Sequence, residues 1–381
     1  MQESSIPSDG SSLEKPPELR VLLVAGSFPP MRCGVGDYSY GLAKALAVDQ
    51  ALHIAVLTSV SGGGAAKTDG IEVYPLMKHW SIAETPQVVT CIRQWSPDIV
   101  HIQYPTQGYG NGFLPWILPI IAFMMRKKVV QTWHEGYGKR SAPKLFLKAI
   151  IPGGLVLVRP QYKDGLPISL RWALWNKQIA FIRNASPMPK ADMDERARND
   201  LRTQYLKGQK RLIVFFGFVY PNKGAELLFE IADPTSDHIV IAGEFVEGSD
   251  YHRNIMRLAS AQPWEGKATI TGFLLSGDIA ALLAIADAVI LPYRVGGGDW
   301  NTSIHAAVLQ GSFVITTSLT RHGYDEKHNV FYARVDDEQE MISALATYAG
   351  RKREYHSDID RDEWKIIANR HRLFYETLLS E

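Results

Sequence analysis

The stretch RVLLVA, residues Arg20 to Ala25, followed at once by Gly26, decides the fold class of this chain. A short unbroken apolar run of this kind is typical of a β-strand buried on both faces of a parallel sheet. A loop rich in Pro and Gly follows over residues 27–36, and helical spacing of apolar residues begins at Asp37. Strand, glycine loop and helix in this order predict the first unit of a Rossmann-like fold.

The same pattern extends along the chain and then restarts. In the first half we expect further strands at residues 53–58, 71–75, 99–103 and 129–132. The restart is Leu212 to Phe216 with Gly217, and strands are then expected at 239–242, 268–271, 288–291 and 313–316. Two successive series of alternating strands and helices predict an α/β protein of two Rossmann-like lobes, with parallel sheets that face a central cleft.

The domain boundaries follow from where this pattern begins and ends. We expect a disordered polar tail over residues 1–19, an N-terminal lobe over 20–188, a C-terminal lobe over 189–360 and a C-terminal helix over 361–381. The linker is expected at 184–190, where Pro and polar residues cluster. The last helix either closes the second lobe or packs back on the first.

Composition and charge exclude several classes of protein. The 46% hydrophobic and 21% charged residues are the usual balance of a globular chain. A formal net charge of +1 gives no overall attraction to nucleic acid, so no such partner is expected. Cys33 and Cys91 lie too far apart to suggest a zinc site. No signal peptide is recognisable, which predicts a cytoplasmic location.

One apolar run, Phe113 to Met125, ends in the basic residues 126–128. It is too short to span a bilayer, and two prolines interrupt it. One interpretation is a buried helix. The other is a patch at a membrane surface, to which Trp172 and Trp175 would add, with the basic residues at anionic headgroups. Both interpretations stay open, and the second implies a peripheral contact at the inner face of the membrane.

Ligands of open parallel sheets bind beyond the carboxyl ends of the strands, and two such segments lie in the first half. Gly34 and Gly36 follow the first strand, where glycines let backbone N–H groups approach an oxyanion. An ordinary tight turn explains them equally well. His134 and Glu135 follow the strand at 129–132. A histidine there contacts a reacting group or simply caps the strand.

Two more segments lie in the second half. Lys223, before Gly224, stands at an expected helix start, where a bound anion would explain a cation that otherwise opposes the helix dipole. A solvated surface lysine is the alternative. The run RVGGGDWNTS, from Arg294 on, suits a phosphate cradle or a flexible loop. Lys223 and Arg294 together would neutralise a pyrophosphate. The capping candidates at the helix start are Asn301, Thr302 and Ser303.

Taken together and in order, five segments resemble family 4 of the retaining glycosyltransferases. They are PPMRCGVGDYSYGLAKAL (29–46), PDIVHIQYP (97–105), VVQTWHE (129–135), FFGFVYPNKG (215–224) and ADAVILPYR (286–294). The resemblance covers roughly residues 20–350. It implies the GT-B fold, in which two Rossmann-like lobes face a donor cleft.

The resemblance also implies a role for each matching residue. Gly36 matches the glycine loop beside the donor phosphates, and His134 matches the histidine near the donor sugar. Lys223 matches the phosphate-binding lysine. Thr302 and Ser303 match the helix N-terminus below the diphosphate. Neither a metal nor another cofactor is implied, because protein cations and helix dipoles take the place of the metal.

The sequence departs from the family pattern at two places. The usual pair of glutamates, spaced E-x7-E, would fall at Gly298 and Ala306, and Asp299 is the nearest acidic residue. The arginine often found shortly before the lysine is missing, and Phe218 and Tyr220 stand nearby instead. Because the second glutamate commonly holds the donor ribose, these departures bear on activity more than on fold.

Two functions follow from these observations. The first is a retaining, metal-independent glycosyltransferase of hexosyltransferase type, with His134 and Asp299 as catalytic candidates. It would move a sugar from a nucleotide-sugar to a saccharide or lipid-linked acceptor in polysaccharide or glycoconjugate assembly. The second is a non-catalytic nucleotide-sugar-binding or assembly protein on the same fold, as the missing glutamates suggest. A sugar-nucleotide epimerase fits the segments less well.

Overall fold

The computed structural model describes residues 18–62, 67–134, 142–159, 166–186, 188–298, 300–353 and 363–380. It divides into two compact units. The first unit holds the chain up to residue 157, residues 161–180 and the chain from 368 on; the second holds 158–160 and 181–367. The division after residue 180 comes before the linker expected at 184–190. The expected tail lies outside the described residues up to residue 17, and Leu19 already begins a strand.

The first unit alternates strands and helices from its start. Its elements are β1 (Leu19–Val24), α1 (Gly34–Ala47), β2 (Leu52–Ser59), β3 (Lys67–Thr68), β4 (Ile71–Met77), η1 (Ile82–Glu84), α2 (Thr85–Trp95), β5 (Ile99–Tyr104), η2 (Gln107–Tyr109), α3 (Leu114–Met124), β6 (Lys128–Trp133), α4 (Ala142–Ala149), β7 (Gly153–Leu157), α5 (Ile168–Ala173), β8 (Lys177–Phe181) and α12 (Glu363–Leu379).

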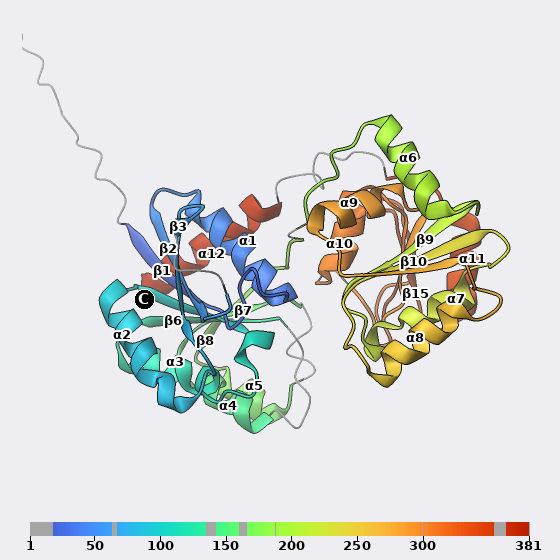
Figure 1. Ribbon diagram of the computed structural model, residues 1–381. Helices are drawn as coiled ribbons and strands as arrows, with labels where there is room; N and C mark the ends of the chain where they lie inside the picture. The colour runs from blue at the N-terminus through green and yellow to red at the C-terminus, as the bar shows by residue number, and fades with distance from the viewer. Residues whose placement is uncertain are drawn as a thin grey trace, which may run out of the picture. The chain divides into compact units, whose positions relative to one another are not determined.

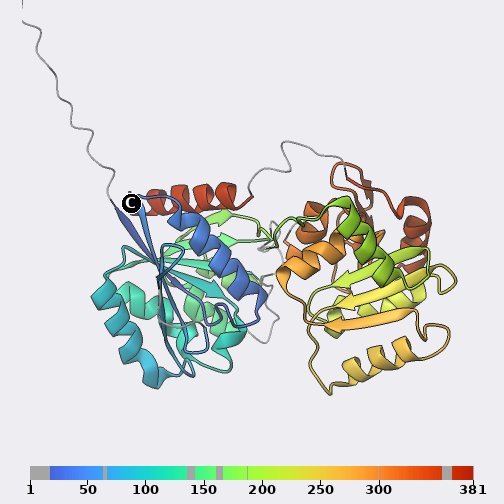
Figure 2. The same ribbon diagram turned by 45° about the horizontal axis from the view of Figure 1, so that its top comes forward.

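The sheet of the first unit has the strand order β3-β4-β2-β1-β5-β6-β7-β8. Strand β1 pairs in parallel with both β2 and β5, so the strand order reverses beside it. Helices α1 and α12 lie on one side of this sheet, and α2, α3, α4 and α5 lie on the other (Figures 1 and 2). This coverage explains why β1 is almost wholly apolar and why every residue of β5 is buried, since parallel strands are buried on both faces.

The second unit repeats the arrangement with a smaller sheet. Its elements are α6 (Glu195–Leu206), β9 (Arg211–Phe216), η5 (Pro221–Lys223), η6 (Ala225–Leu227), α7 (Leu228–Ile231), β10 (Asp237–Ala242), α8 (Asp250–Ser260), β11 (Ala268–Gly272), α9 (Ser276–Ile285), β12 (Ala288–Leu291), α10 (Thr302–Leu309), β13 (Val314–Thr317), β14 (Gly323–Asp325), β15 (Val330–Ala333) and α11 (Glu338–Tyr348).

The second sheet has the order β11-β10-β9-β12-β13-β15-β14. Strand β9 pairs in parallel with β10 on one side and β12 on the other, so the order reverses between β9 and β12. Helices α6, α9 and α10 cover one face, and α7, α8 and α11 cover the other (Figure 1). Crevices at such a switch point, beyond the carboxyl ends of the strands, are where α/β sheets bind ligands.

Every strand expected from the sequence is present in the structure. The short strands β3, β7, β8, β14 and β15 were not predicted, because each is brief or carries a glycine start that hides the apolar pattern. One local expectation is corrected: Gly34 and Gly36 do not lie in the loop after β1. They form the first turn of α1, whose N-cap is Cys33.

The apolar run at residues 113–125 forms α3, which is neither fully buried nor fully exposed. Leu114, Leu118 and Ala122 are buried, whereas Phe123 and Met124 stand at the surface. One face of the helix therefore packs on the sheet and its last turn reaches solvent. Among the described residues, none of the helices combines the length and the apolar character needed to cross a membrane.

Candidate functional site

The switch point of the second unit collects the residues that the sequence singled out. Gly217 and Lys223 follow the carboxyl end of β9, and Tyr293 follows the carboxyl end of β12. The two segments are tied together by the Arg294 amide, which donates to the carbonyl oxygen of Asn222 over 3.1 Å. The N-terminus of α10 reaches the same place, as the next contacts show.

Tyr293 joins the lysine to the helix. The Lys223 Nζ atom lies 4.7 Å from the centroid of the Tyr293 ring, a cation–π contact. The Ser303 side chain, in the first turn of α10, lies close enough to the Tyr293 hydroxyl to oppose the rise in its pKa. Burial raises the pKa of that hydroxyl, so it stays a neutral phenol. The ammonium of Lys223 and the positive end of the α10 dipole are therefore gathered around one buried ring.

Glycines make this close approach possible. Gly224 has φ +70°, and a Cβ atom there would stand 2.4 Å from the Pro292 carbonyl oxygen. Gly217 has φ +134°, and its Cβ would meet the Ser303 hydroxyl at 3.2 Å. Both backbone conformations favour glycine. Because neither glycine has a side chain, the end of β9 can lie close to the end of β12 and to the start of α10.

The glycine run before α10 is a packed segment, which corrects the alternative of a flexible surface loop. Gly297 is buried, and a Cβ atom there would meet the Tyr293 ring at 2.8 Å. Asn301 is the N-cap of α10 by position, but its side chain does not cap the helix. Its Oδ1 instead accepts from the Gly298 amide over 3.0 Å and closes the turn. The amides of the first helical turn therefore have no capping side chain.

Arg294 is held by carboxylates at the edge of this cluster, and its expected contact with a phosphate stays a prediction. Its guanidinium forms an ion pair with Glu226 and a second with Asp336 at 3.3 Å. The hydrogen bond that Arg294 donates to Glu226 raises the pKa of Arg294 further. Glu226 also accepts from the Tyr251 hydroxyl. A phosphate bound by Arg294 would therefore share the guanidinium with two carboxylates.

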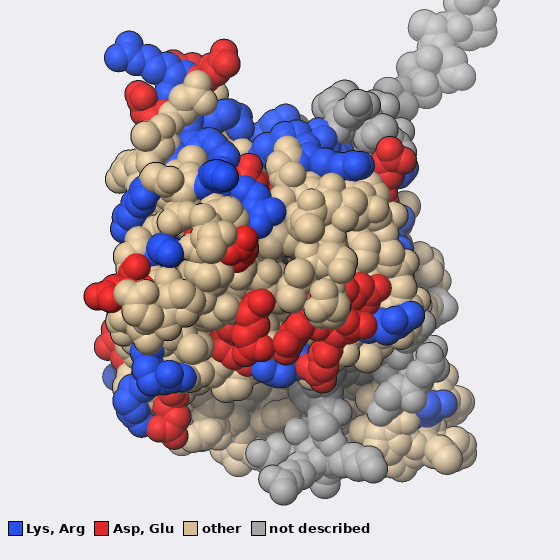
Figure 3. Space-filling view, turned by 90° about the vertical axis from the view of Figure 1, so that its right-hand side faces the viewer, with Lys and Arg blue, Asp and Glu red and all other residues tan. Residues whose placement is uncertain are grey.

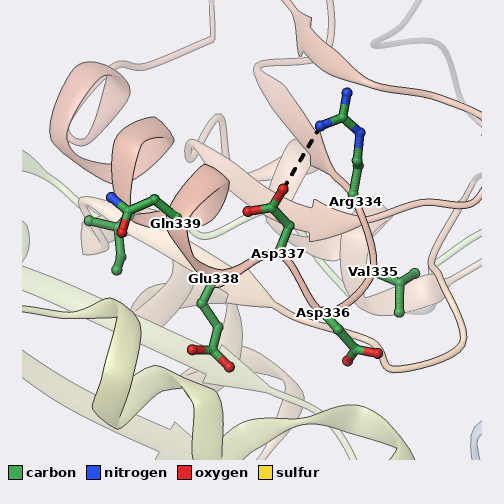
Figure 4. A pocket seen from close by; sticks show the side chains of 7 residues that line it. Arg334, Val335, Asp336, Asp337, Glu338 and Gln339 are labelled. Carbon is green, nitrogen blue, oxygen red and sulfur yellow. Dashed lines mark ion pairs between the residues drawn. The ribbon is translucent and has the colours of Figure 1, made fainter.

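An open cavity of about 570 Å³ lies on the far side of that ion pair, lined by Arg334, Val335, Asp336, Asp337, Glu338, Gln339 and Ile342. Figure 4 shows the carboxylates of Asp336 and Glu338 both extending toward the lower part of the view, and an ion pair between Arg334 and Asp337. Acidic side chains also gather in a band on the face of the second unit seen in Figure 3. Such walls repel a diphosphate, so the cavity is not its site.

In the first unit, His134 stands at the carboxyl end of β6 and is 6% exposed. Its backbone N–H donates to the Tyr104 carbonyl oxygen over 2.7 Å, which continues the β5–β6 pairing. Its ring packs edge-on against Tyr38 of α1, with centroids 4.8 Å apart. Its Nε2 lies 2.8 Å from Oε1 of Gln103 on β5. Three elements therefore fix this imidazole.

The contact with Gln103 belongs to a buried chain of hydrogen bonds. His101 Nδ1 lies 2.7 Å from the Tyr375 hydroxyl of α12, and His101 Nε2 receives the Gln103 amide over 3.1 Å. Burial, and then the nearby His371 and His134, lower the pKa of His101 well below its usual value, so His101 is neutral. Thr132 Oγ1 also lies 2.7 Å from His101 Nε2. In the assigned orientation of the Gln103 amide its oxygen faces His134, and a proton on His134 Nε2 completes that hydrogen bond.

The start of α1 is packed against the end of β1. A Cβ atom at Gly36 would stand 3.0 Å from the Ser27 carbonyl oxygen, so this glycine allows a close approach of helix and loop. Gly34 is exposed at the beginning of the helix. Asp37 follows in the first turn, and burial raises its pKa to about 6. Gly36 thus has a packing role, and the expected place of the glycine pair near an anion stays a prediction.

Two of the expected site residues, Glu135 and Asp299, lie outside the described residues. Within the parts that are described, no group of three His, Cys, Asp or Glu side chains is arranged to hold a metal ion. Sequence reasoning missed Tyr293, His101 and Gln103. A signal existed for the last two, because polar residues at alternate positions of an otherwise apolar strand need buried partners.

With this geometry described, comparisons with known proteins become informative. Residues 210–350 match the model of the family Glycosyl transferases group 1. No curated protein sequence matched. Among solved structures, sucrose-phosphate synthase from Thermosynechococcus elongatus is similar at TM-score 0.70 and 15% identity, covering 95% of this chain and 99% of that one. The catalytic domain of starch synthase IV from Arabidopsis thaliana, bound to ADP and acarbose, is similar at TM-score 0.69 and 14% identity. The match covers 96% of this chain and 100% of that one.

HepE from Anabaena, in complex with UDP-glucose, gives a TM-score of 0.67 at 16% identity, over 95% of this chain and 100% of the other. At such identities these likenesses establish the fold, which is GT-B, with two α/β units as expected. The resemblance to glycosyltransferases is confirmed at the level of the group 1 family model over 210–350. The narrower membership of family 4 stays a prediction.

Proposed function

On the basis of a second unit that matches the glycosyl transferases group 1, we propose that this protein is a retaining glycosyltransferase that uses a nucleotide-sugar donor. The acceptor is a saccharide or a lipid-linked saccharide, and the setting is polysaccharide or glycoconjugate assembly in the cytoplasm. One observation carries the proposal: Lys223 and the Ser303 turn of α10 meet at Tyr293, at the switch point of the sheet. Among the similar structures, HepE was solved with UDP-glucose and starch synthase IV with ADP and acarbose.

The chemistry needed at this place is stabilisation of a leaving diphosphate. When the bond between the anomeric carbon and the phosphate oxygen breaks, the electron pair leaves with the diphosphate and its negative charge grows. The Lys223 ammonium and the α10 amides are fixed donors for that charge, and one such donor is worth about 3 kcal/mol in the transition state. Because these groups supply positive charge, we expect transfer to continue when divalent metal is chelated.

The new bond forms between the anomeric carbon and the acceptor oxygen on the face from which the diphosphate leaves. The acceptor proton passes to the leaving phosphate oxygen, so configuration is retained without a carboxylate nucleophile. We assign His134 to contact with the donor sugar, as the resemblance implies. His134 suits a positioning role because its ring is fixed and because its Nε2 proton is already donated to Gln103.

The test is calorimetry with a panel of UDP-, GDP-, dTDP- and ADP-glucose, followed by transfer assays with the donor that binds. Lys223→Ala should weaken donor binding and lower turnover at least about tenfold, a loss of ~1.4 kcal/mol. The matched control is Lys210→Ala, an exposed lysine at the opposite end of β9, which should change neither. Unchanged turnover in Lys223→Ala would remove this lysine from the reaction.

A second function is favoured by the departures from the E-x7-E pattern. Ala306 is completely buried in α10, so no carboxylate stands at that position to hold a ribose. A donor-binding protein without transfer activity fits this substitution. The same experiment separates the two functions: tight binding of one nucleotide-sugar, with no transfer to any saccharide or lipid-linked acceptor offered, supports the binding protein.

A further inference from the structure

An apolar and basic surface on the first unit is not used by the proposed reaction. It is formed at the ends of α4 and α5, and we call it the α4–α5 surface. Its exposed apolar side chains are Phe146, Ile150, Ile168, Trp172 and Trp175. Trp172 and Trp175 are 75% and 79% exposed, and Ile168 is 82% exposed. Large apolar side chains so far from burial mark an interaction site when they are contiguous.

Local geometry makes these residues contiguous. Ile168, Trp172 and Trp175 stand at positions i, i+4 and i+7, and the Trp175 amide donates to the Trp172 carbonyl oxygen over 3.1 Å, so the turn continues past the end of α5. Asn176 Nδ2 then donates to the Ile150 carbonyl oxygen over 3.2 Å, which joins this turn to the end of α4. Two helices thus present one row of apolar side chains.

The charge around this surface indicates what covers it. Residues 113–177 contain eleven Lys and Arg but two Asp and Glu, whereas the whole chain is nearly neutral; of these cations Lys148 and Lys177 are buried and do not belong to the surface. Arg171 is exposed on α5 between the apolar positions. Arg126 is exposed at the end of α3, which packs against α4, and Met124 beside it is 76% exposed. A surface of exposed apolar side chains with arginines between them and few acidic residues nearby is complementary to a surface that is anionic outside and apolar inside.

We propose that the α4–α5 surface docks on an anionic lipid membrane. Trp172 and Trp175 enter the headgroup layer, where indole rings are favoured, while Arg171 and Arg126 pair with lipid phosphates. The chain then lies on the membrane without crossing it. The surface is part of the first unit alone, so the proposal stands whether the protein transfers sugars or only binds them. A lipid-linked acceptor would be met at the same membrane.

The experiment is flotation of the full-length protein with vesicles of phosphatidylcholine, with and without phosphatidylglycerol. Wild-type protein should float with the anionic vesicles and be released by high salt. The Trp172→Ser/Trp175→Ser variant should bind about tenfold more weakly. Leu373→Ser is the matched control, because Leu373 is 61% exposed on α12, on the other side of the sheet, and it should float like wild type.

Two further measurements keep the result clear. An unchanged thermal midpoint and an unchanged donor affinity in each variant would show that the fold and the second unit are intact. The Trp172→Phe/Trp175→Phe variant should keep most of the vesicle binding that the serine variant loses. Wild-type protein that stays at the bottom of the gradient with anionic vesicles overturns the proposal. So does a serine variant that floats as wild type does. If sedimentation velocity instead shows a dimer that the serine variant abolishes, without vesicle binding, the surface joins two copies of the chain.

Discussion

The two units hold their buried cations differently, although ion pairs such as Arg372 with Asp49 also occur in the first unit. In the second unit arginines are matched by carboxylates: Arg211 with Asp237 at 2.6 Å and Arg202 with Asp287 at 2.8 Å. In the first unit Lys148 and Lys177 are buried. Lys148 Nζ lies 3.6 Å from the centroid of the Tyr104 ring, and Lys177 Nζ donates to the Ile151 carbonyl oxygen over 2.6 Å. Burial lowers the pKa of both lysines.

The same contrast separates the two candidate functional groups. His134 is held by side chains that run through a buried chain of hydrogen bonds to α12, whereas Lys223 is placed by backbone turns at the ends of strands. Changes in the first unit should therefore cost stability together with function. Changes in the second should affect ligand binding with little cost to the fold. Three substitutions test this difference.

The largest effect is expected for Lys177→Met. Burial lowers the pKa of Lys177 from 10.5 to about 7, so between these values the unfolded chain binds more protons than the folded one. The wild-type free energy of unfolding should consequently rise with pH across this window, by on the order of 3–5 kcal/mol relative to the variant. Urea unfolding at several pH values measures it.

Lys210→Met is the control for that titration, since Lys210 is exposed, and its difference from wild type should not vary with pH. A constant difference between wild type and Lys177→Met from pH 7 to pH 10 would mean that this lysine is charged and solvated in the folded protein. The first unit would then handle its cations much as the second does.

An intermediate effect is expected for Gln103→Leu. The substitution removes the acceptor of the His134 Nε2 proton and the donor to His101, which should lower the free energy of unfolding by about 1–3 kcal/mol. Nitrogen NMR of the His134 ring should show the proton no longer confined to Nε2. Transfer should fall while donor affinity stays the same. An unaltered His134 spectrum would show that Gln103 does not set the tautomer.

The smallest effect is expected for Ser303→Ala. The substitution deletes the hydroxyl beside Tyr293 but keeps the backbone amide at the start of α10. Affinity for UDP should change by less than about threefold, or ~0.6 kcal/mol, with the thermal midpoint nearly unchanged. Ser312→Ala, which removes a buried hydrogen bond to the Leu283 carbonyl elsewhere in the unit, should leave UDP affinity as it is. A large loss of affinity in Ser303→Ala would make the side chain, rather than the amides, the main ligand.

The sequence predicted the long elements well because their signals are local. Apolar runs such as RVLLVA and the restart at Leu212 gave the strands of both sheets. It failed where the deciding contact is distant. Gly34 and Gly36 were expected in a loop, but α1 begins at Gly34 and Gly36 packs against Ser27. The sequence likewise carried no sign that Glu226, 68 positions away, pairs with Arg294.

The sequence by itself determined that two α/β series follow one another and that Lys223 and the α10 start lie at strand ends, since period and glycine position are written in neighbouring residues. Only the tertiary structure decided that Tyr293 links those two groups, that Tyr375 reaches His101 across the chain, and that Trp172 and Trp175 stay in solvent. The physical reason is that hydrogen bonds and burial depend on which distant segments meet, and a local pattern carries no record of its partner.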